Sequence, residues 1–234
     1  MKAPGIWLRT ICRKNGLIVG DEQIELFERY VKELLGWNRK INLISRQDEE
    51  LVWQNHILHS VSPLFKLKLQ EPATVMDLGT GGGLPGIPLK ILLPDSEILL
   101  VDATRKKIMA VQEILVKLNL PGIRAIWGRA EDLANDQNLL SHFDYIVARG
   151  VATLDKLISW CGPFLRPSTA HQDLADNLRI IPPALIAFKG GILDDEIREA
   201  TLSRRLRSTE VLDLVFPGSE EMSTGGKKIV VASF

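Results

Sequence analysis

The stretch that most constrains how this chain can fold is residues 77–88, with the sequence DLGTGGGLPGIP. An apolar run precedes it and another follows, and this pattern predicts a strand, a tight turn and a helix. Gly79, Gly81 and Gly83 let the backbone take positive φ angles and leave no Cβ between the chain and a ligand. The amides at the start of the helix would then point at polar groups of that ligand. We therefore expect a turn that holds something flat and polar.

Composition limits the partners of the protein and its compartment. The chain has 234 residues, 45% of them hydrophobic, which suffices for one α/β domain with a smaller appendage. Lys plus Arg equals Asp plus Glu at 29 each, so a polyanion would have to be met by a local patch. No apolar run approaches the ~20 residues of a membrane span, and no signal peptide is evident. We expect a cytoplasmic protein without a membrane segment.

The two cysteines, Cys12 and Cys161, lie far apart in the sequence. This spacing fits a reducing compartment and disfavours a metal site. Cys161 falls within an apolar helical pattern and is expected to pack in the core. We therefore predict no metal.

Residues 1–70 are predicted to form a small helical subdomain. From Asp21, a good N-cap residue, apolar side chains recur at helical spacing as far as residue 35, while charged ones fall opposite. A second helical pattern covers residues 51–64. No element is assigned before Asp21, and the sheet domain is expected to span residues 71–234.

In the second part, short apolar runs alternate with longer helical patterns. Strands are predicted at residues 74–78, 97–101, 123–127, 143–148, 184–188, 210–215 and 228–232, with helices ending at residue 93 and spanning residues 104–119, 153–164 and 194–206. Such alternation predicts a mostly parallel sheet covered on both faces. The last two strands have no helix between them, so the final one is expected to be antiparallel. The arrangement resembles an α/β, Rossmann-like class I S-adenosylmethionine methyltransferase fold with seven strands and an N-terminal helical extension, and we expect that fold. Residues 166–183 are expected to form a surface loop.

The acids around the glycine turn narrow the choice of ligand. A Walker loop would need a Gly-Lys-Ser/Thr ending, which is absent. Asp102 ends the second predicted strand, 23 positions after Gly79, where a carboxylate can accept both ribose hydroxyls of a nucleoside. Asp102 could equally cap the helix that follows, and the two roles are compatible. Asp77 either braces the turn or contacts the amino group of a methyl donor.

Two later strand ends add candidates. Ala130 and Glu131 follow the third strand and could contact an adenine edge, or could simply be a helix start with an acid placed for its dipole. Arg149 ends the fourth strand and would open into the crevice where ligands of open α/β sheets sit. The alternative for Arg149 is a solvated surface side chain. Ala103 and Thr104, next to Asp102, complete the predicted site for a methyl donor.

Several segments together resemble a known family. They are LGWNRKINL at residues 35–43, His56-Ile57-Leu58 with Ser60, the turn with its LPGIP tail at residues 84–88, Val101-Asp102, Ala148-Arg149 and Lys189-Gly190. The chain is similar, in this order of segments, to the bacterial small-subunit ribosomal RNA guanine-N7 methyltransferases known as RsmG or GidB. His59, Ile44, Gly82 and Gly150 depart from the residues usual in that family.

The resemblance implies an enzyme that uses S-adenosylmethionine to methylate N7 of guanosine-527 in the 530 loop of 16S ribosomal RNA. The donor contacts that it implies are Gly79, Leu84, Asp102, Ala130, Glu131 and Arg149. The N-terminal helices would help to receive the RNA, either free or in a small-subunit assembly intermediate, and we expect a monomer.

Guanine N7 carries an in-plane lone pair and no proton, so direct attack on a sulfonium methyl needs no general base. Arg149, the one candidate for a catalytic side chain, is therefore predicted to act by positioning. It would hold the donor, a carboxylate or an RNA phosphate, because an arginine bound to N7 would block the nucleophile.

RNA binding by a neutral protein requires clustered basic residues. The candidates form one predicted rim around the pocket: Arg39, Lys40, Arg46, Arg105, Lys106, Lys107 and Lys189, with His56 at the interface. Each could alternatively be an ordinary solvated side chain.

Three other functions stay open at this point: a small-molecule methyltransferase, a nicotinamide-dependent oxidoreductase and a non-catalytic nucleotide-binding regulator. An oxidoreductase is expected to carry a proton relay such as Tyr with a nearby Lys, and neither Tyr30 nor Tyr145 is so placed.

Overall fold

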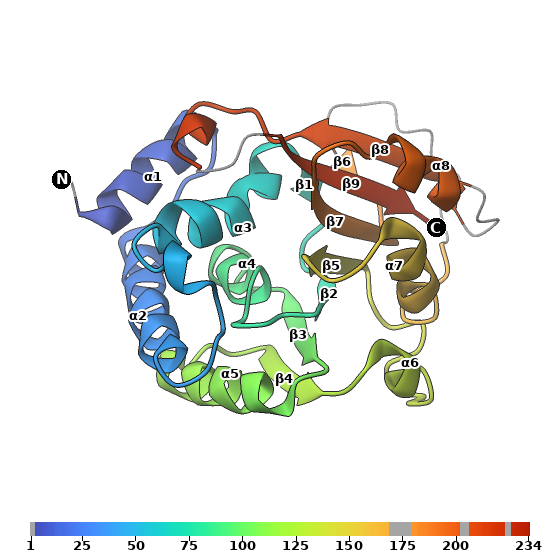
Figure 1. Cartoon of the computed structure of the whole chain (residues 1–234), viewed down its shortest axis with the longest axis horizontal. Coiled ribbons are helices and arrows are strands. Elements are labelled where there is room, and N and C mark those ends of the chain that lie inside the picture. Colours follow the sequence, from blue (N-terminus) through green and yellow to red (C-terminus); the bar gives the residue numbers. More distant parts are fainter. Residues whose placement is uncertain (1–2, 169–178, 202–205, 223–225) are drawn as a thin grey trace.

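The computed structural model describes residues 3–168, 179–201, 206–222 and 226–234 (Figure 1). The helices are α1 (Pro4–Lys14), α2 (Asp21–Asn38), η1 (Arg46–Asp48), η2 (Trp53–Leu58), α3 (His59–Val61), η3 (Ser62–Phe65), α4 (Gly86–Leu92), α5 (Arg105–Leu118), α6 (Ala130–Leu133), α7 (Leu154–Cys161), α8 (Asp194–Thr201) and η4 (Ser219–Glu221). The strands are β1 (Lys68–Leu69), β2 (Thr74–Leu78), β3 (Glu97–Asp102), β4 (Ile123–Trp127), β5 (Tyr145–Arg149), β6 (Arg179–Ile180), β7 (Ala184–Gly190), β8 (Ser208–Asp213) and β9 (Lys227–Ser233).

The seven-stranded sheet has the order β4-β3-β2-β5-β7-β9-β8. β2 lies at its centre, with Leu78 opposite Val101 of β3 and Ala148 of β5 in parallel register. β9 runs antiparallel to both β7 and β8. The predicted α/β fold, with one antiparallel strand at the end of the chain, is confirmed.

The two faces of the sheet carry different helices because side chains alternate along each strand. In β3, Ile98 and Leu100 face the cluster that includes the N-terminal helices, α4 and α5, while Leu99 and Val101 face the cluster with α6, α7 and α8. Figure 1 shows α1 to α5 on one side of the sheet and α6 to α8 on the other. The prediction of helices on both faces is correct.

The N-terminal helices share a hydrophobic core with one face of the sheet. Phe27 and Tyr30 of α2 are fully buried, in the same cluster as Leu100 of β3. The Tyr30 hydroxyl donates a hydrogen bond of 2.9 Å to the carbonyl oxygen of Gly82 in the glycine turn. Helix α2 therefore supports the glycine turn through a direct hydrogen bond.

Helix α1 begins at Pro4, in a region where the sequence pattern assigned no element. Pro4 suits a first helical turn, and Leu8 and Cys12 form the buried face. Gly5 is a contact point between helices: a Cβ there would lie 2.5 Å from Ile24 of α2. The glycine therefore permits close packing of α1 on α2, a contact that a sequence pattern does not show.

The predicted surface loop of residues 166–183 is corrected at its end. Residues 179–180 form β6, which pairs in parallel with β1, and Ile180 is buried. The Tyr145 hydroxyl donates a hydrogen bond of 2.8 Å to the Ile180 carbonyl oxygen. Residues 169–178, which that prediction also covered, lie outside the described residues.

The connection between β8 and β9 packs on α1 (Figure 1). The Trp7 indole donates to Glu221 at 2.8 Å, and the Asn15 side-chain amide donates to the Pro217 carbonyl oxygen at 2.9 Å. Phe216 is buried in the core beside Phe65, with 4.9 Å between ring centroids. The connection between β8 and β9 therefore stabilises the position of α1.

Some predicted ends shift in the structure. The fourth strand begins at Tyr145, since Phe143 forms only an isolated bridge to Leu165. The strand predicted at residues 210–215 is β8, two residues earlier, and α8 is described as far as Thr201.

Within the described residues, no helix is both long and apolar enough to cross a bilayer. Cys12 and Cys161 are both buried and unpaired, and burial raises the pKa of the Cys12 thiol to about 12. The prediction that Cys161 packs in the core is confirmed.

Tyr30→Phe should lower the free energy of unfolding by about 1–3 kcal/mol, because the buried Gly82 carbonyl oxygen loses its donor. Urea denaturation would measure this loss. Tyr145→Phe is the matched control, since its hydroxyl lies beside β6. Hydrogen exchange at the Gly83 and Leu84 amides should accelerate only in Tyr30→Phe; equal acceleration in both variants would contradict a local role.

Candidate functional site

The glycine turn is held by hydrogen bonds to the neighbouring strand. The amides of Gly79 and Thr80 both donate to the Val101 carbonyl oxygen, at 2.8 and 2.9 Å. Gly79 has φ +74°, and a Cβ there would lie 2.4 Å from the Val151 side chain. Only glycine combines this conformation with this approach, so the turn has one fixed shape against the ends of β3 and β5.

Asp77 lies behind the turn and is fully buried. Its Oδ2 accepts a hydrogen bond of 2.6 Å from the Thr80 hydroxyl and one of 2.8 Å from the Gly86 amide. Of the two roles considered for Asp77, these hydrogen bonds show the one that braces the turn. The expectation that amides at the helix start point at a ligand is corrected, because the Gly86 amide is bound to Asp77.

A cavity of about 180 Å³ opens where the carboxyl ends of β2, β3 and β4 meet. Its lining comprises Leu78, Gly79, Val101, Asp102, Ala103, Gly128, Arg129, Ala130, Glu131, Val151 and Trp160. It is smaller than the ~300 Å³ or more of a drug-sized ligand site. It can therefore enclose only part of a larger ligand, whose remainder must extend beyond it.

Asp102 is the acidic side chain of this cavity at the end of β3. Oδ1 accepts from the Thr104 amide at 2.7 Å, and Oδ2 accepts from the Gly81 amide at 2.9 Å. Each carboxylate oxygen has a second lone pair, so two acceptor positions remain. The bracing role and the ribose-binding role considered for Asp102 are compatible in this geometry.

The opposite wall begins at α6, directly after β4. Ala130 and Glu131 are the first two residues of this short helix, and their amides form no hydrogen bond within the described part of the chain. These donors lie on the cavity wall, where the edge of a planar heterocycle could accept from them. Glu131 itself is exposed.

The structure brings together five of the predicted donor residues: Gly79, Asp102, Ala103, Ala130 and Glu131. It places six others away from the cavity lining: Asp77, Gly81, Gly83, Leu84, Thr104 and Arg149. Leu84 is 3% exposed and packs in the core behind the turn.

Trp160 is the most informative lining residue that sequence reasoning missed. In α7, Leu154, Leu157, Ile158 and Cys161 form the buried stripe. Trp160 falls off this stripe and is half-buried, a departure from helical period that could have marked it.

Arg149 ends β5 on the side of the turn that faces the N-terminal segment. Its Nη2 lies 3.2 Å from His56 Nδ1, and its Nη1 lies 3.5 Å from the Ser60 hydroxyl. Burial lowers the pKa of Arg149, and the nearby Tyr30 and Asp77 oppose this shift. The N-terminal segment therefore completes this half of the site.

Comparison with known proteins identifies the family. The family model for GidB, rRNA small subunit methyltransferase G, matches residues 23–174. The ribosomal RNA small subunit methyltransferase G of Chlorobaculum tepidum is 36% identical over 227 residues, covering 96% of each chain. This chain belongs to the rRNA small subunit methyltransferase G family. The protein of the same name from Moorella thermoacetica is 37% identical over 159 residues, 68% of this chain and 66% of that one.

A solved structure supports the fold assignment for this family member. The TYW2 protein of M. jannaschii in complex with AdoMet superposes with a TM-score of 0.54 at 13% identity, covering 83% of this chain and 77% of that one. Together with the strand order, this likeness shows the class I S-adenosylmethionine methyltransferase fold.

The predicted basic residues of this methyltransferase G family member differ in their surroundings. Arg39, Lys40, Arg46, Arg105 and Lys106 are exposed, and Lys107 is half-buried. The Lys40 ammonium lies 4.6 Å from the centre of the Trp37 ring, and the Arg105 guanidinium lies 5.7 Å from that of Trp127. These cation–π pairs place exposed positive charge beside aromatic surface.

Lys189 is committed to contacts within the protein. Its ammonium lies 2.5 Å from Glu196 and donates a hydrogen bond of 2.7 Å to the Ala152 carbonyl oxygen. The side chain is only 12% exposed. This geometry disagrees with the placement of Lys189 in a rim of free basic residues.

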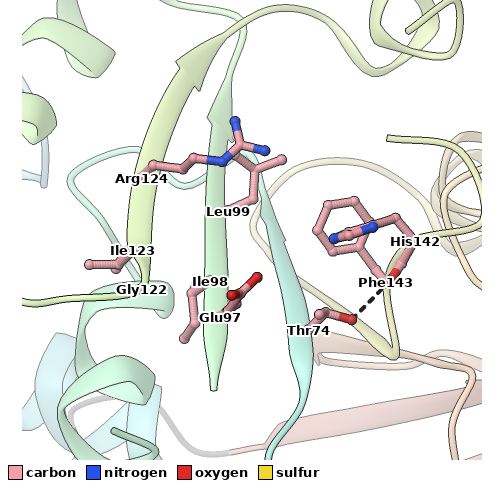
Figure 2. A pocket seen from close by; sticks show the side chains of 9 residues that line it. All are labelled: Thr74, Glu97, Ile98, Leu99, Gly122, Ile123, Arg124, His142 and Phe143. Carbon is pink, nitrogen blue, oxygen red and sulfur yellow. Dashed lines mark hydrogen bonds between the residues drawn. The ribbon is translucent and has the colours of Figure 1, made fainter. Parts of the chain in front are cut away.

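A second cavity, of about 350 Å³, lies at the opposite ends of β2, β3 and β4, where their amino ends meet (Figure 2). Thr74, Glu97 and Arg124 come from the amino ends of β2, β3 and β4, with His142 on the facing loop. Ligands of open α/β sheets bind outside the carboxyl ends of the strands. The larger cavity is therefore not the candidate donor site. Within the described residues, no group of three or more His, Cys, Asp or Glu side chains could hold a metal ion.

Burial raises the pKa of Asp77 from 3.8 to about 6, against the hydrogen bonds from Thr80 and Gly86. Between about pH 4 and pH 6, the folded protein therefore holds a proton that the unfolded chain has released. The stability gained from this proton is present below about pH 4 and is lost as the pH rises to about 6.

Asp77→Asn keeps an acceptor for both donors and cannot titrate. Its free energy of unfolding should fall less than that of the wild type across this range, by on the order of 2 kcal/mol. Urea denaturation at a series of pH values measures the difference, with the exposed Asp213→Asn as control. Parallel curves for Asp77→Asn and the wild type would contradict the raised pKa.

Proposed function

We propose that this protein transfers the methyl group of S-adenosylmethionine to N7 of a guanosine in 16S ribosomal RNA, the guanosine of the 530 loop that its family resemblance implies. The match to the rRNA small subunit methyltransferase G family carries the proposal, since it spans the glycine turn, Asp102 and Arg149. The substrate is the free RNA or a small-subunit assembly intermediate, and the protein acts as a monomer.

The cavity residues fit the nucleoside part of S-adenosylmethionine. Asp102 retains two acceptor positions for a ribose diol. The amides of Ala130 and Glu131, which donate to none of the described residues, suit the acceptors on an adenine edge, and Trp160 and Val151 supply apolar wall. A methyl donor has no phosphates, in keeping with a turn whose described amides mostly bind within the protein.

The cavity is too small for the whole donor, so the methionine part would extend past Gly79 towards Arg149. A guanidinium there would bind its carboxylate, or a phosphate of the incoming RNA. S-adenosylmethionine supplies a methyl group on a positively charged sulfur, which a neutral nitrogen lone pair can attack in line. The Arg149 guanidinium holds its anion away from N7, leaving that lone pair free.

The titratable groups near Arg149 suit a reaction without a general base. Burial and the charge of Arg149 lower the pKa of His56 to about 4 and that of His59 to about 2. Both imidazoles are therefore weak bases, poorly matched to removing a proton near pH 7. N7 has no proton to give up, so the protein's contribution is positioning and electrostatics.

The exposed cations of Arg39, Lys40, Arg46, Arg105 and Lys106 supply local phosphate contacts on a chain that carries no net charge. Phosphate contacts of this kind give most nucleic-acid complexes their salt dependence. Binding of the RNA should therefore weaken steeply as the salt concentration rises.

The cofactor assignment is tested by calorimetry. S-adenosylmethionine and S-adenosylhomocysteine should both bind the wild-type protein, and NAD should not. Asp102→Asn should weaken binding by about 10- to 100-fold, since a charged acceptor for the ribose is lost. The exposed Asp95→Asn is the control. Preference for NAD, or wild-type affinity in Asp102→Asn, would contradict the assignment.

The substrate is tested by mapping N7-methylguanosine along 16S ribosomal RNA from cells that lack the protein. One modification in the 530 loop should be absent, and a plasmid copy of the wild-type gene should restore it. Arg149→Ala should not restore it although the protein folds, because the anion contact is lost. An unchanged methylation map in the deletion strain would reject the proposed substrate.

A further inference from the structure

The N-terminal segment brings a histidine to the guanidinium of Arg149. His56 lies in η2, a π-helix, and such helices are rare and frequent at functional sites. Its Nδ1 lies 3.2 Å from Arg149 Nη2. Within the described residues, Arg149 forms no ion pair with a carboxylate, so this imidazole is its nearest side-chain acceptor.

The other ring nitrogen of His56 faces an acid. His56 Nε2 lies 3.4 Å from Asp48 Oδ2, with the imidazole 13% exposed. Asp48 Oδ1 also accepts a hydrogen bond of 2.8 Å from the Asn55 side chain. Asp48, His56 and Arg149 therefore form a chain from a half-buried acid to the edge of the candidate site.

Residues 37–43, with the sequence WNRKINL, lead into the loop that carries Asp48 and help to hold it. Asn38 Oδ1 accepts from the amides of Leu43 and Ile44 at 2.8 and 2.9 Å, and its amide donates to Glu49 at 2.6 Å. Asn38 is 1% exposed. The position of the acid behind His56 is thus fixed by a buried hydrogen-bond network.

The chemistry of the three groups fixes the proton on the imidazole. A guanidinium only donates hydrogen bonds, so Nδ1 must accept from it without a proton of its own. The proton of the neutral ring then lies on Nε2, which is 3.4 Å from Asp48 Oδ2 but forms no hydrogen bond among the described residues, so Asp48 acts on the ring through its charge. The acid favours the tautomer that presents an acceptor to Arg149.

We propose that His56, oriented by Asp48, is a positioning residue that sets the direction of the Arg149 guanidinium towards its anion in the site. The inference rests on the proposed methyl transfer, in which that anion belongs to the methyl donor or to the RNA. It revises the prediction of His56 as an RNA contact, because both ring nitrogens face other side chains. His59 cannot replace it, since its ring lies edge-to-face on Phe188 with centroids 5.2 Å apart.

A double-mutant cycle on the full chain tests the coupling. His56→Leu removes the acceptor, and His56→Asn keeps an amide oxygen near the position of Nδ1. Calorimetry with S-adenosylhomocysteine gives the donor arm, and the kcat and KM for undermodified 16S ribosomal RNA at saturating donor give the RNA arm. His142→Leu, at the opposite edge of the sheet, is the control and should match the wild type.

In the wild-type background, His56→Leu should lose about 10- to 100-fold in whichever arm Arg149→Ala also loses, since the guanidinium is no longer held. His56→Asn should regain most of that loss. In the Arg149→Ala background, His56→Leu should change neither arm further, because its effect passes through the guanidinium. A donor-arm loss identifies a carboxylate as the anion, and an RNA-arm loss identifies a phosphate.

Equal losses for His56→Leu with and without Arg149 would overturn the proposal, as would failure of His56→Asn to rescue a folded protein. If His56→Leu does not fold, Asp48→Asn replaces it in the same cycle. Failure of the proposed function is a separate result: the wild-type protein then neither binds S-adenosylhomocysteine nor methylates the RNA.

Discussion

The hydrogen bonds that Asp77 accepts from Thr80 and Gly86 hold the site in its shape. They close the glycine turn on itself and leave its outer side free to face the ends of β3 and β5. The brace is a buried acid whose pKa is raised by its surroundings, so the turn is maintained at a cost in solvation. The donors on Thr80 and Gly86 offset part of that cost. The lining of the candidate pocket begins from this fixed point.

The N-terminal segment is part of the site in structural terms. Tyr30 reaches the turn from behind and His56 reaches Arg149 from the side. The class I fold by itself supplies the sheet and the cavity near Asp102. The half of the site around Arg149 is formed by two parts of the chain that are 93 positions apart. Substitutions in the helices before β1 can thus alter the site without touching the sheet.

Much of this arrangement could be predicted from the sequence, because hydrophobic periodicity is local and the carboxyl ends of parallel strands meet at one edge. That reasoning brought Asp102 and Ala130 to one cavity. It failed where the outcome depends on partners distant in sequence or on close approach. Lys189 forms an ion pair with Glu196 of the next helix, and Gly5 lets α1 pack tightly on α2. Periodicity shows neither contact.

The contact between α1 and the connection before β9 has a consequence for the order of assembly. Trp7 and Glu221 are separated by 214 positions along the chain. A ribosome must therefore add 214 residues after Trp7 before α1 can acquire this partner. Contacts of such long sequence range also slow folding, because the chain loses the entropy of closing a long loop before the contact can form. Until that point in synthesis, the face of α1 that carries Trp7 lacks its partner Glu221.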